Sequence, residues 1–221
     1  MKSTFNIKTM AEIAMFAAIG YVLDALAGAY SAPIFVNGGS IGIAMVCVLI
    51  VAYRRGTLAG VLTGIIMGLL DIADGFYVIA STWYLSLAQV FFDYIIAYPL
   101  VGLAGLFRKL AINQKNAKIN ILWLIVGCLF GGLLKLGSHY FSGILFWNDP
   151  ASFVWGFTNG YLYSLIYNGA YMLPCIMLCT ALMIFIGKKW PMILREPNST
   201  LLFKKAQATN NDKEGNTHEK N

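Results

Sequence analysis

The stretch INILWLIVGCLFGGLLKLGSHYF, residues 119–141, decides the fold of this chain. It exceeds the roughly 20 mainly apolar residues that an α-helix needs to cross a bilayer. Only Lys135 and His139 in it belong to the basic or acidic residue types. Ionisable side chains inside a membrane are costly and usually serve a function. The stretch therefore predicts a membrane-spanning helix that carries part of a functional site.

The whole chain has the composition of a membrane protein. Of its 221 residues, 58% are hydrophobic and 12% are charged, and the mean hydropathy is +0.67. About a quarter of the residues are charged in soluble domains. We therefore predict an all-α integral membrane protein, and its length provides for about six spans.

Turn signals and clusters of charge divide the chain into six predicted transmembrane helices. These cover residues 10–29, 39–53, 57–70, 84–107, 119–141 and 161–186. Residues 1–9 form a predicted N-terminal tail, and residues 10–187 form the six-helix membrane domain. Residues 188–221 form a basic and polar tail, which we expect to be disordered because it contains few apolar residues.

The basic residues predict the orientation, since Lys and Arg are enriched in cytoplasmic loops. With six spans, one side of the membrane receives Lys2, Lys8, Arg54, Arg55, Arg108, Lys109, Lys115, Lys118, Lys188 and Lys189. The opposite loops hold Asp71, Asp74 and Asp149 and no Lys or Arg. Both termini are therefore predicted to be cytoplasmic. The net charge of +6 is then explained by basic residues at the cytoplasmic membrane surface, where they face anionic lipid. It does not indicate nucleic-acid binding.

Asp93 is the most informative ionisable residue, because it lies well inside the helix predicted for 84–107. A carboxylate at that depth requires a cation, either Lys135 or a bound ligand. Glu12 and Asp24 lie nearer the ends of the first helix, where they can reach water. A structural Asp93–Lys135 ion pair is the alternative to ligand binding.

Polar and aromatic residues of three predicted helices are candidates for one binding pocket. His139, Gly143 and Trp147 are four residues apart and share a helix face with Lys135. The other candidates are Trp83, Tyr84, Tyr94, Tyr163 and Asn168. An interfacial aromatic belt is the alternative explanation for the Trp and Tyr residues. It does not explain Asn168, whose amide needs a partner in an apolar helix.

Two stripes of small residues permit close helix approach. One contains Gly60, Gly64 and Gly68, and the other contains Ala11, Ala14, Ala18 and Ala25. Internal packing is the simpler interpretation of both stripes. The alternative is a flat face that docks a partner protein.

The sequence argues against catalysis. One of the two histidines, His218, lies in the predicted tail, so a multi-histidine metal site is not expected. Neither a nucleophile-elbow motif nor a phosphate-binding P-loop occurs, and any energy from ATP must come from a partner. No cofactor or metal is predicted. A carboxylate beside aromatic faces, an amide and an imidazole favours a flat, nitrogen-rich organic cation as the ligand.

Five segments in order resemble the thiamine-specific substrate-binding (S) components of energy-coupling factor (ECF) transporters. They are MAEIAMFAAIG, NGGSIGIAMVCVLIVAYRRG, SLAQVFFDYIIAYPLVGLAGLFR, HYFSGILFW and YSLIYNGAYMLP. The resemblance extends over residues 10–189. It implies a multi-pass protein of the bacterial cell membrane that binds thiamine with high affinity. It also implies two kinds of partner, a transmembrane coupling (T) component and two cytoplasmic ATPases.

The resemblance also implies roles for individual residues. Asp93, where the family often has Glu, faces the thiazolium beside Tyr94, and Trp147 stacks on the ligand. His139 and Gly143 line the same wall, with Gly143 leaving space for a flat ring. The remaining ligand-binding candidates are Tyr163, Asn168, Trp83 and Lys135. Ala14 and Ala18 match the motif that docks the coupling component.

Two other functions remain open at this point. An S component for a different vitamin would share the architecture, and a neutral ligand would make Asp93 dispensable. A small membrane enzyme or channel-like protein would need no coupling component, and bulky residues at Ala14 and Ala18 would leave its activity intact.

Overall fold

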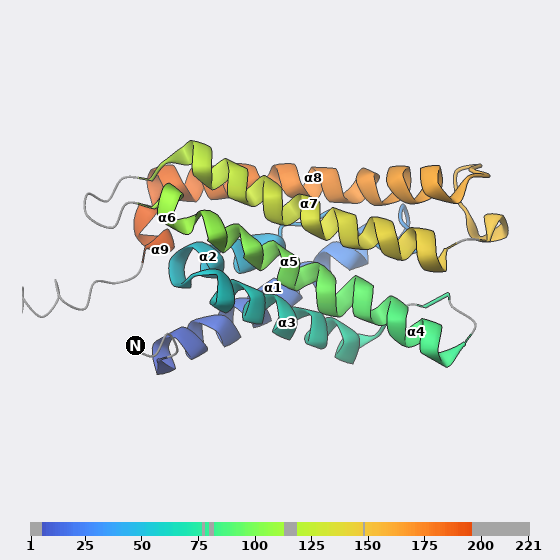
Figure 1. Ribbon diagram of the computed structural model, residues 1–221, viewed down its shortest axis with the longest axis horizontal. Helices are drawn as coiled ribbons and strands as arrows, with labels where there is room; N and C mark the ends of the chain where they lie inside the picture. The colour runs from blue at the N-terminus through green and yellow to red at the C-terminus, as the bar shows by residue number, and fades with distance from the viewer. Residues whose placement is uncertain (1–5, 77, 80–81, 113–118, 148, 196–221) are drawn as a thin grey trace, which may run out of the picture.

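The computed structural model describes residues 6–76, 78–79, 82–112, 119–147 and 149–195, and these form a bundle of helices with no strand among them (Figure 1). The first three helices are α1 (Ile7–Ser31), α2 (Met45–Arg55) and α3 (Thr57–Asp74). The next stretch, Trp83–Ala111, is one continuous run of helical turns. The last long helices, α7 (Ile121–Phe146) and α8 (Gly160–Lys189), are followed by the short α9 (Pro191–Leu194).

The run from Trp83 to Ala111 changes its helical type along its length. It consists of α4 (Trp83–Val90), the π-helix η1 (Phe91–Ile96), α5 (Ala97–Gly102), the 3₁₀-helix η2 (Leu103–Phe107) and α6 (Arg108–Ala111). A further 3₁₀-helix, η3 (Pro150–Ser152), precedes α8. π-Helical turns inside longer helices are frequent at functional sites. The position of η1 therefore draws attention to Asp93, which lies within it.

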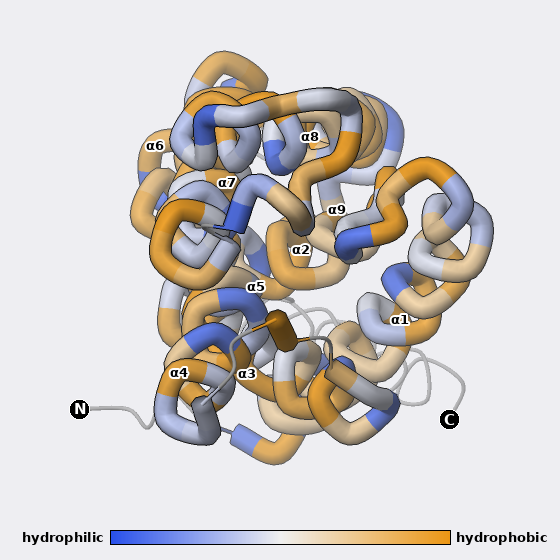
Figure 2. The backbone as a smooth tube through the Cα atoms, turned by 90° about the vertical axis from the view of Figure 1, so that its right-hand side faces the viewer, coloured by the Kyte–Doolittle hydropathy of each residue, from blue (hydrophilic) through white to orange (hydrophobic). Residues whose placement is uncertain are grey.

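Five helices in the described part of the chain are long and apolar enough to cross a membrane: α1, α3, the Trp83–Ala111 run, α7 and α8. The predicted count of six spans is not confirmed, because α2 has only 11 residues. At 1.5 Å per residue it is about 16 Å long, roughly half the thickness of the bilayer core. Figure 2 shows hydrophobic residues on helices all around the bundle.

The second predicted helix, 39–53, begins six residues late for an identifiable reason. Gly38 and Gly39 have φ values of +90° and +99°, which are incompatible with a right-handed helix. The backbone that follows bonds to side chains instead: the N–H of Ile41 donates to Ser31 Oγ over 3.1 Å, and that of Gly42 to Cys175 Sγ over 3.2 Å. Irregular backbone at membrane depth is tolerated where protein groups satisfy it.

α2 forms the centre of the bundle, and residues 45–53 are all buried. Its Tyr53 hydroxyl donates to the carbonyl of Leu124 on α7 over 2.9 Å. The glycine stripe of α3 packs internally, as the simpler interpretation predicted. A Cβ at Gly64 or Gly68 would lie within 2.6 Å of the backbone of Tyr98 or Tyr94. These glycines therefore bring α3 against α5 and η1.

The alanine stripe of α1 has the opposite environment. α1 buries Ile13, Ala17 and Gly20 against the bundle, whereas Ala14 and Ala18 are exposed. Ala11 and Ala25 are exposed as well. Internal packing within this chain therefore does not explain the stripe.

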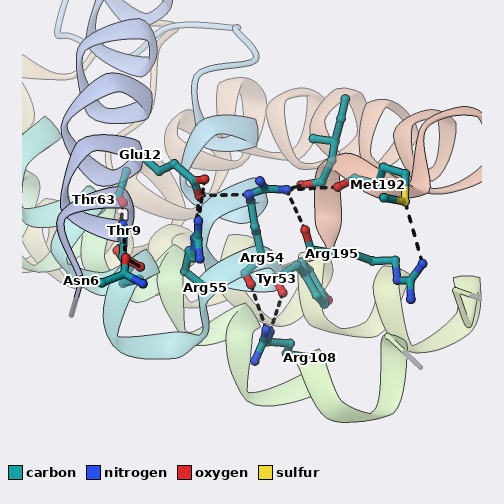
Figure 3. Close-up of polar contacts among 12 residues, drawn as sticks. Asn6, Thr9, Glu12, Tyr53, Arg54, Arg55, Thr63, Arg108, Met192 and Arg195 are labelled. Carbon is teal, nitrogen blue, oxygen red and sulfur yellow. Dashed lines mark hydrogen bonds and ion pairs between the residues drawn. The ribbon is translucent and has the colours of Figure 1, made fainter. Parts of the chain in front are cut away.

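An arginine cluster joins three helices at the end of the bundle where α1 begins (Figure 3). Arg54 Nε lies 2.9 Å from a carboxylate oxygen of Glu12, and Arg55 meets both carboxylate oxygens at 2.7 Å. Arg54 Nη1 also donates to the carbonyls of Met192, Ile193 and Arg195, at 3.0, 3.1 and 2.6 Å. The cluster therefore ties α1, α2 and α9 together.

Both described ends of the chain lie at this end of the bundle (Figure 1), which fits termini on one side of a membrane. That this side is cytoplasmic stays a prediction. The tail predicted for 188–221 is ordered in its first part, because α8 extends to Lys189 and α9 buries Leu194 completely. The rest, 196–221, lies outside the described residues, as do residues 1–5 of the N-terminal tail.

Candidate ligand-binding site

A cavity of about 360 Å³ lies between α1, α3, η1, α5, α7, α8 and the connection 32–44. Ligand pockets typically measure about 300–1,000 Å³. Eight of the ten pocket candidates from the sequence line this cavity: Asp93, Tyr94, Lys135, His139, Gly143, Trp147, Tyr163 and Asn168. Tyr84, which is 56% exposed, is absent from the described lining. Trp83 is absent from the described lining, because its side chain is 75% exposed and packs edge-on against Tyr84 with ring centroids 5.9 Å apart.

The π-helix places Asp93 opposite α7. His139 Nδ1 lies 3.3 Å from Asp93 Oδ1. A carboxylate only accepts hydrogen bonds, so this contact puts a hydrogen atom on Nδ1. One residue earlier on α7, the Ser138 hydroxyl donates to the carbonyl of Phe92 over 2.7 Å. Both contacts hold the carboxylate at the cavity wall.

The proposed ion pair between Asp93 and Lys135 is wrong for this structure. Lys135 Nζ lies 3.6 Å from the centroid of the Tyr98 ring, a cation–π contact. The Tyr98 hydroxyl donates to Asp24 Oδ2, and the Ser40 hydroxyl donates to Asp24 Oδ1 over 3.1 Å. Lys135 thus contacts α5 and not Asp93, and Asp24 is part of the site.

Gly143 has a second role that the sequence did not indicate. It lines the cavity, but a Cβ added there would lie 2.1 Å from Ser164 Oγ and 2.9 Å from Ser164 Cβ. Ser164 is itself buried and donates to the carbonyl of Tyr140 over 2.9 Å. The space expected for a flat ring is therefore occupied in this structure by α8, and the glycine lets α7 and α8 approach.

Asn168 finds the partners that an amide in an apolar helix requires. Its Nδ2 donates to the carbonyl of Ser164 at 2.9 Å and to that of His139 at 3.3 Å. Its Oδ1 accepts from the Tyr171 hydroxyl over 2.6 Å. The amide thus joins the backbone of α7 to the Tyr171 ring, which packs edge-on to His139 with centroids 6.1 Å apart.

The connection 32–44 covers one side of the cavity, where the sequence was least informative. Asn37 Nδ2 donates to the Tyr163 hydroxyl over 2.8 Å, and the Tyr167 hydroxyl donates to the carbonyl of Gly38 over 2.9 Å. The Tyr163 ring stacks on Phe153, with centroids 4.3 Å apart. A Cβ at Gly39 would lie 2.5 Å from the Tyr171 ring, so only glycine allows this approach.

Three further carboxylates line the cavity, and sequence analysis missed all of them. Asp71 and Asp74 come from the last turn of α3 and Asp24 from α1. Asp71 and Asp74 were assigned to a loop, although their spacing of three places them on one face of a helix. That spacing, at the end of an apolar run, was the available signal. Gln89 and Cys175 also line the cavity.

Comparison with known proteins agrees with this architecture. Residues 10–195 match the family model described as thiamine transporter protein (Thia_YuaJ). The chain is 30% identical over 200 residues to thiamine transporter ThiT of Bacillus subtilis, covering 88% of this chain and 98% of that protein. It is 32% identical over 130 residues to the ThiT of Lacticaseibacillus paracasei, covering 57% and 61%. A solved structure of ThiT from Listeria monocytogenes superposes with a TM-score of 0.67 at 26% identity, covering 86% of this chain and 98% of that one.

Proposed function

Because the chain belongs to the thiamine transporter family, with a family match over residues 10–195, we propose that its cavity binds thiamine for transport across the membrane. It is a membrane protein with a transport role and not an enzyme, as its relatives are named thiamine transporters. The resemblance noted in the sequence is thereby confirmed at the level of the family. The binding of thiamine by this chain is our proposal.

The charge of the cavity wall is the observation that carries the proposal. In the described part of the chain four carboxylates line it, those of Asp24, Asp71, Asp74 and Asp93, together with one ammonium group from Lys135. Thiamine carries a permanent positive charge on its thiazolium ring. A cation among carboxylates and aromatic faces gains Coulomb attraction and cation–π contact, each strengthened where water is excluded.

We assign Asp93 to face the thiazolium, with Tyr94 beside it on the same π-helix. Trp147, 8% exposed at the end of α7, supplies the stacking ring. His139 reaches Asp93 and the ligand edge from the same wall. Stacking and cation–π contact each contribute about 1–2 kcal/mol in a desolvated site.

The other lining residues support these contacts. Lys135 offers hydrogen-bond donors from above the Tyr98 ring, and Tyr163 completes the wall beside the connection 32–44. Asn168 positions His139 and Tyr171 through its amide. Trp83, exposed at the start of α4, has no part in this assignment.

Energy for uptake is proposed to come from partners. We infer that the chain is a high-affinity S component of an ECF transporter, working with a transmembrane coupling component and two cytoplasmic ATPases. In support, Ala14 and Ala18 form an exposed small-residue face on α1. Such a face permits close approach of a partner helix in the bilayer.

The test is a calorimetric titration of the purified full-length chain in detergent with thiamine, with riboflavin and biotin as controls. Submicromolar binding of thiamine alone, lost in Trp147→Ala, is expected. Binding of another vitamin in place of thiamine would contradict thiamine as the ligand. Binding of none of the three would contradict the substrate-binding function.

A further inference from the structure

The acidic residues of this chain are concentrated in the cavity. Among the described residues, four of the six Asp and Glu residues line it, compared with one of the nine Lys and Arg residues. Asp93 has a role in the proposed function, which leaves Asp24, Asp71 and Asp74 without one. These three, from α1 and α3, are called the acidic wall below.

The acidic wall belongs to a constructed site. Asp24 is held in place by the hydroxyls of Tyr98 and Ser40, so its carboxylate has a fixed position. Asp71 is partly buried and Asp74 is exposed, which places Asp74 at the mouth of the cavity. All three line the same space as Asp93. The cavity therefore has three carboxyl groups in addition to the one assigned to the thiazolium.

Two buried polar groups in the same lining indicate that this space holds a ligand. Ser142 is 1% exposed, and its hydroxyl has no hydrogen-bond partner among the described residues. Lys135 is 8% exposed, and within the described chain its ammonium contacts only the face of the Tyr98 ring, with no acceptor atom. Buried polar groups without partners are costly, so both point to a ligand with polar atoms.

We propose that the acidic wall makes the site selective for thiamine itself and against its phosphate esters. This inference rests on the proposed function. A phosphate monoester adds a charge of about −1.5 to −2 at neutral pH. The ester must bring this charge into a space lined by three carboxylates besides Asp93. The ammonium of Lys135, the one Lys or Arg side chain in the described lining, does not balance them.

The hydroxyethyl tail of unmodified thiamine has no charge and meets no such repulsion. Its hydroxyl can donate to a carboxylate of the wall, whereas a phosphate offers mainly acceptors, which a carboxylate cannot satisfy. Like charges separated by a few ångströms repel each other much more strongly in a site with little water than in bulk water. The discrimination should therefore be largest for the diphosphate.

The test compares dissociation constants for thiamine, thiamine monophosphate and thiamine diphosphate, measured by calorimetry on the full-length chain in detergent. The wild type is expected to bind the diphosphate at least about tenfold more weakly than thiamine. Asp71→Asn should narrow this ratio by at least about threefold, through tighter binding of the diphosphate. Asp24→Asn should act in the same direction, since the amide oxygen can still accept from one of the two hydroxyls and the amide N–H can donate to the other.

Asp149→Asn is the matched control, because Asp149 caps the exposed η3 away from the described lining, and an amide can also accept from the N–H of Ala151. It removes the same charge and should leave the ratio of the two dissociation constants unchanged.

Asp74→Asn at the cavity mouth replaces any variant of the acidic wall that fails to fold. Equal affinities in the wild type, or a ratio unaffected by every wall variant while thiamine still binds, would overturn the inference alone. Failure of thiamine to bind would overturn the proposed function as well.

Discussion

His139 on α7 and Asp93 on the π-helix η1 meet at the cavity wall, with Nδ1 3.3 Å from Oδ1. The two residues are 46 positions apart in the sequence. Their side chains remain partly open to the cavity, at 14% and 20% exposure. The imidazole thus orients a carboxylate that still has acceptor capacity for a ligand.

Asp93→Asn should weaken thiamine binding about 10- to 100-fold, the equivalent of losing one charge-assisted contact of about 1.5–3 kcal/mol. The amide keeps the size of the side chain, so folding should be unaffected. Calorimetric titration measures the affinity, and thermal unfolding without ligand checks the fold. Unchanged thiamine affinity would remove Asp93 from the site.

Gly143→Ala should lower the stability of the ligand-free protein by about 1–3 kcal/mol, because the new methyl group would overlap Ser164 Oγ. Gly137→Ala is the control on the same helix, since no atom lies within 4 Å of its added Cβ. That change should be neutral or slightly stabilising. The readout is the midpoint of thermal unfolding in detergent.

Ser164→Ala in the Gly143→Ala background should restore part of the lost stability, because it removes the nearer of the two clashing atoms. If the stability losses of the two single variants simply add in the double variant, the contact between Gly143 on α7 and Ser164 on α8 is not the cause of the loss in Gly143→Ala.

Arg54→Ala should destabilise the end of the bundle where α1, α2 and α9 meet. Three backbone carbonyls would lose their donor, at a cost of about 1–3 kcal/mol. Lys188→Ala, which removes an exposed cation nearby on α8, should have almost no effect. The thiamine affinity of the variant, measured at a temperature where it is fully folded, should not change, because the cluster lies outside the described cavity lining. Equal unfolding midpoints for the two variants would contradict the role of Arg54.

The membrane class and the positions of the long helices were predictable because they depend on the length and hydropathy of local segments. Contacts across helices were predictable only where a chemical requirement was strong. A carboxylate at the depth of Asp93 had to find a donor, but the sequence favoured Lys135 and the fold supplied His139. The rotation of the helix about its own axis determines which of these two residues Asp93 faces. The π-helical turn affects that rotation, and the turn has no periodic pattern in the sequence from which it could be predicted.

The acidic wall and the short α2 were missed for related reasons. Asp24 and Asp71 appeared to be at the water-facing ends of helices because the connection 32–44, which covers the cavity, has no hydropathy pattern of its own. The same connection takes up the residues that a longer second helix would have used. Its positive-φ glycines, Gly38 and Gly39, were part of the resemblance but did not by themselves indicate a turn.

Ala14→Trp and Ala18→Trp should reduce thiamine uptake by cells at least about tenfold and leave the thiamine affinity of the purified chain unchanged. Both positions are exposed on α1, so an indole there should not disturb the bundle but would keep a partner helix at a distance. Met177→Trp is the matched control, a 70% exposed position on α8. It adds the same bulk to the lipid-facing surface and should leave uptake intact. Normal uptake in both alanine variants would remove α1 from the partner interface, whereas loss of binding would show that α1 supports the cavity instead.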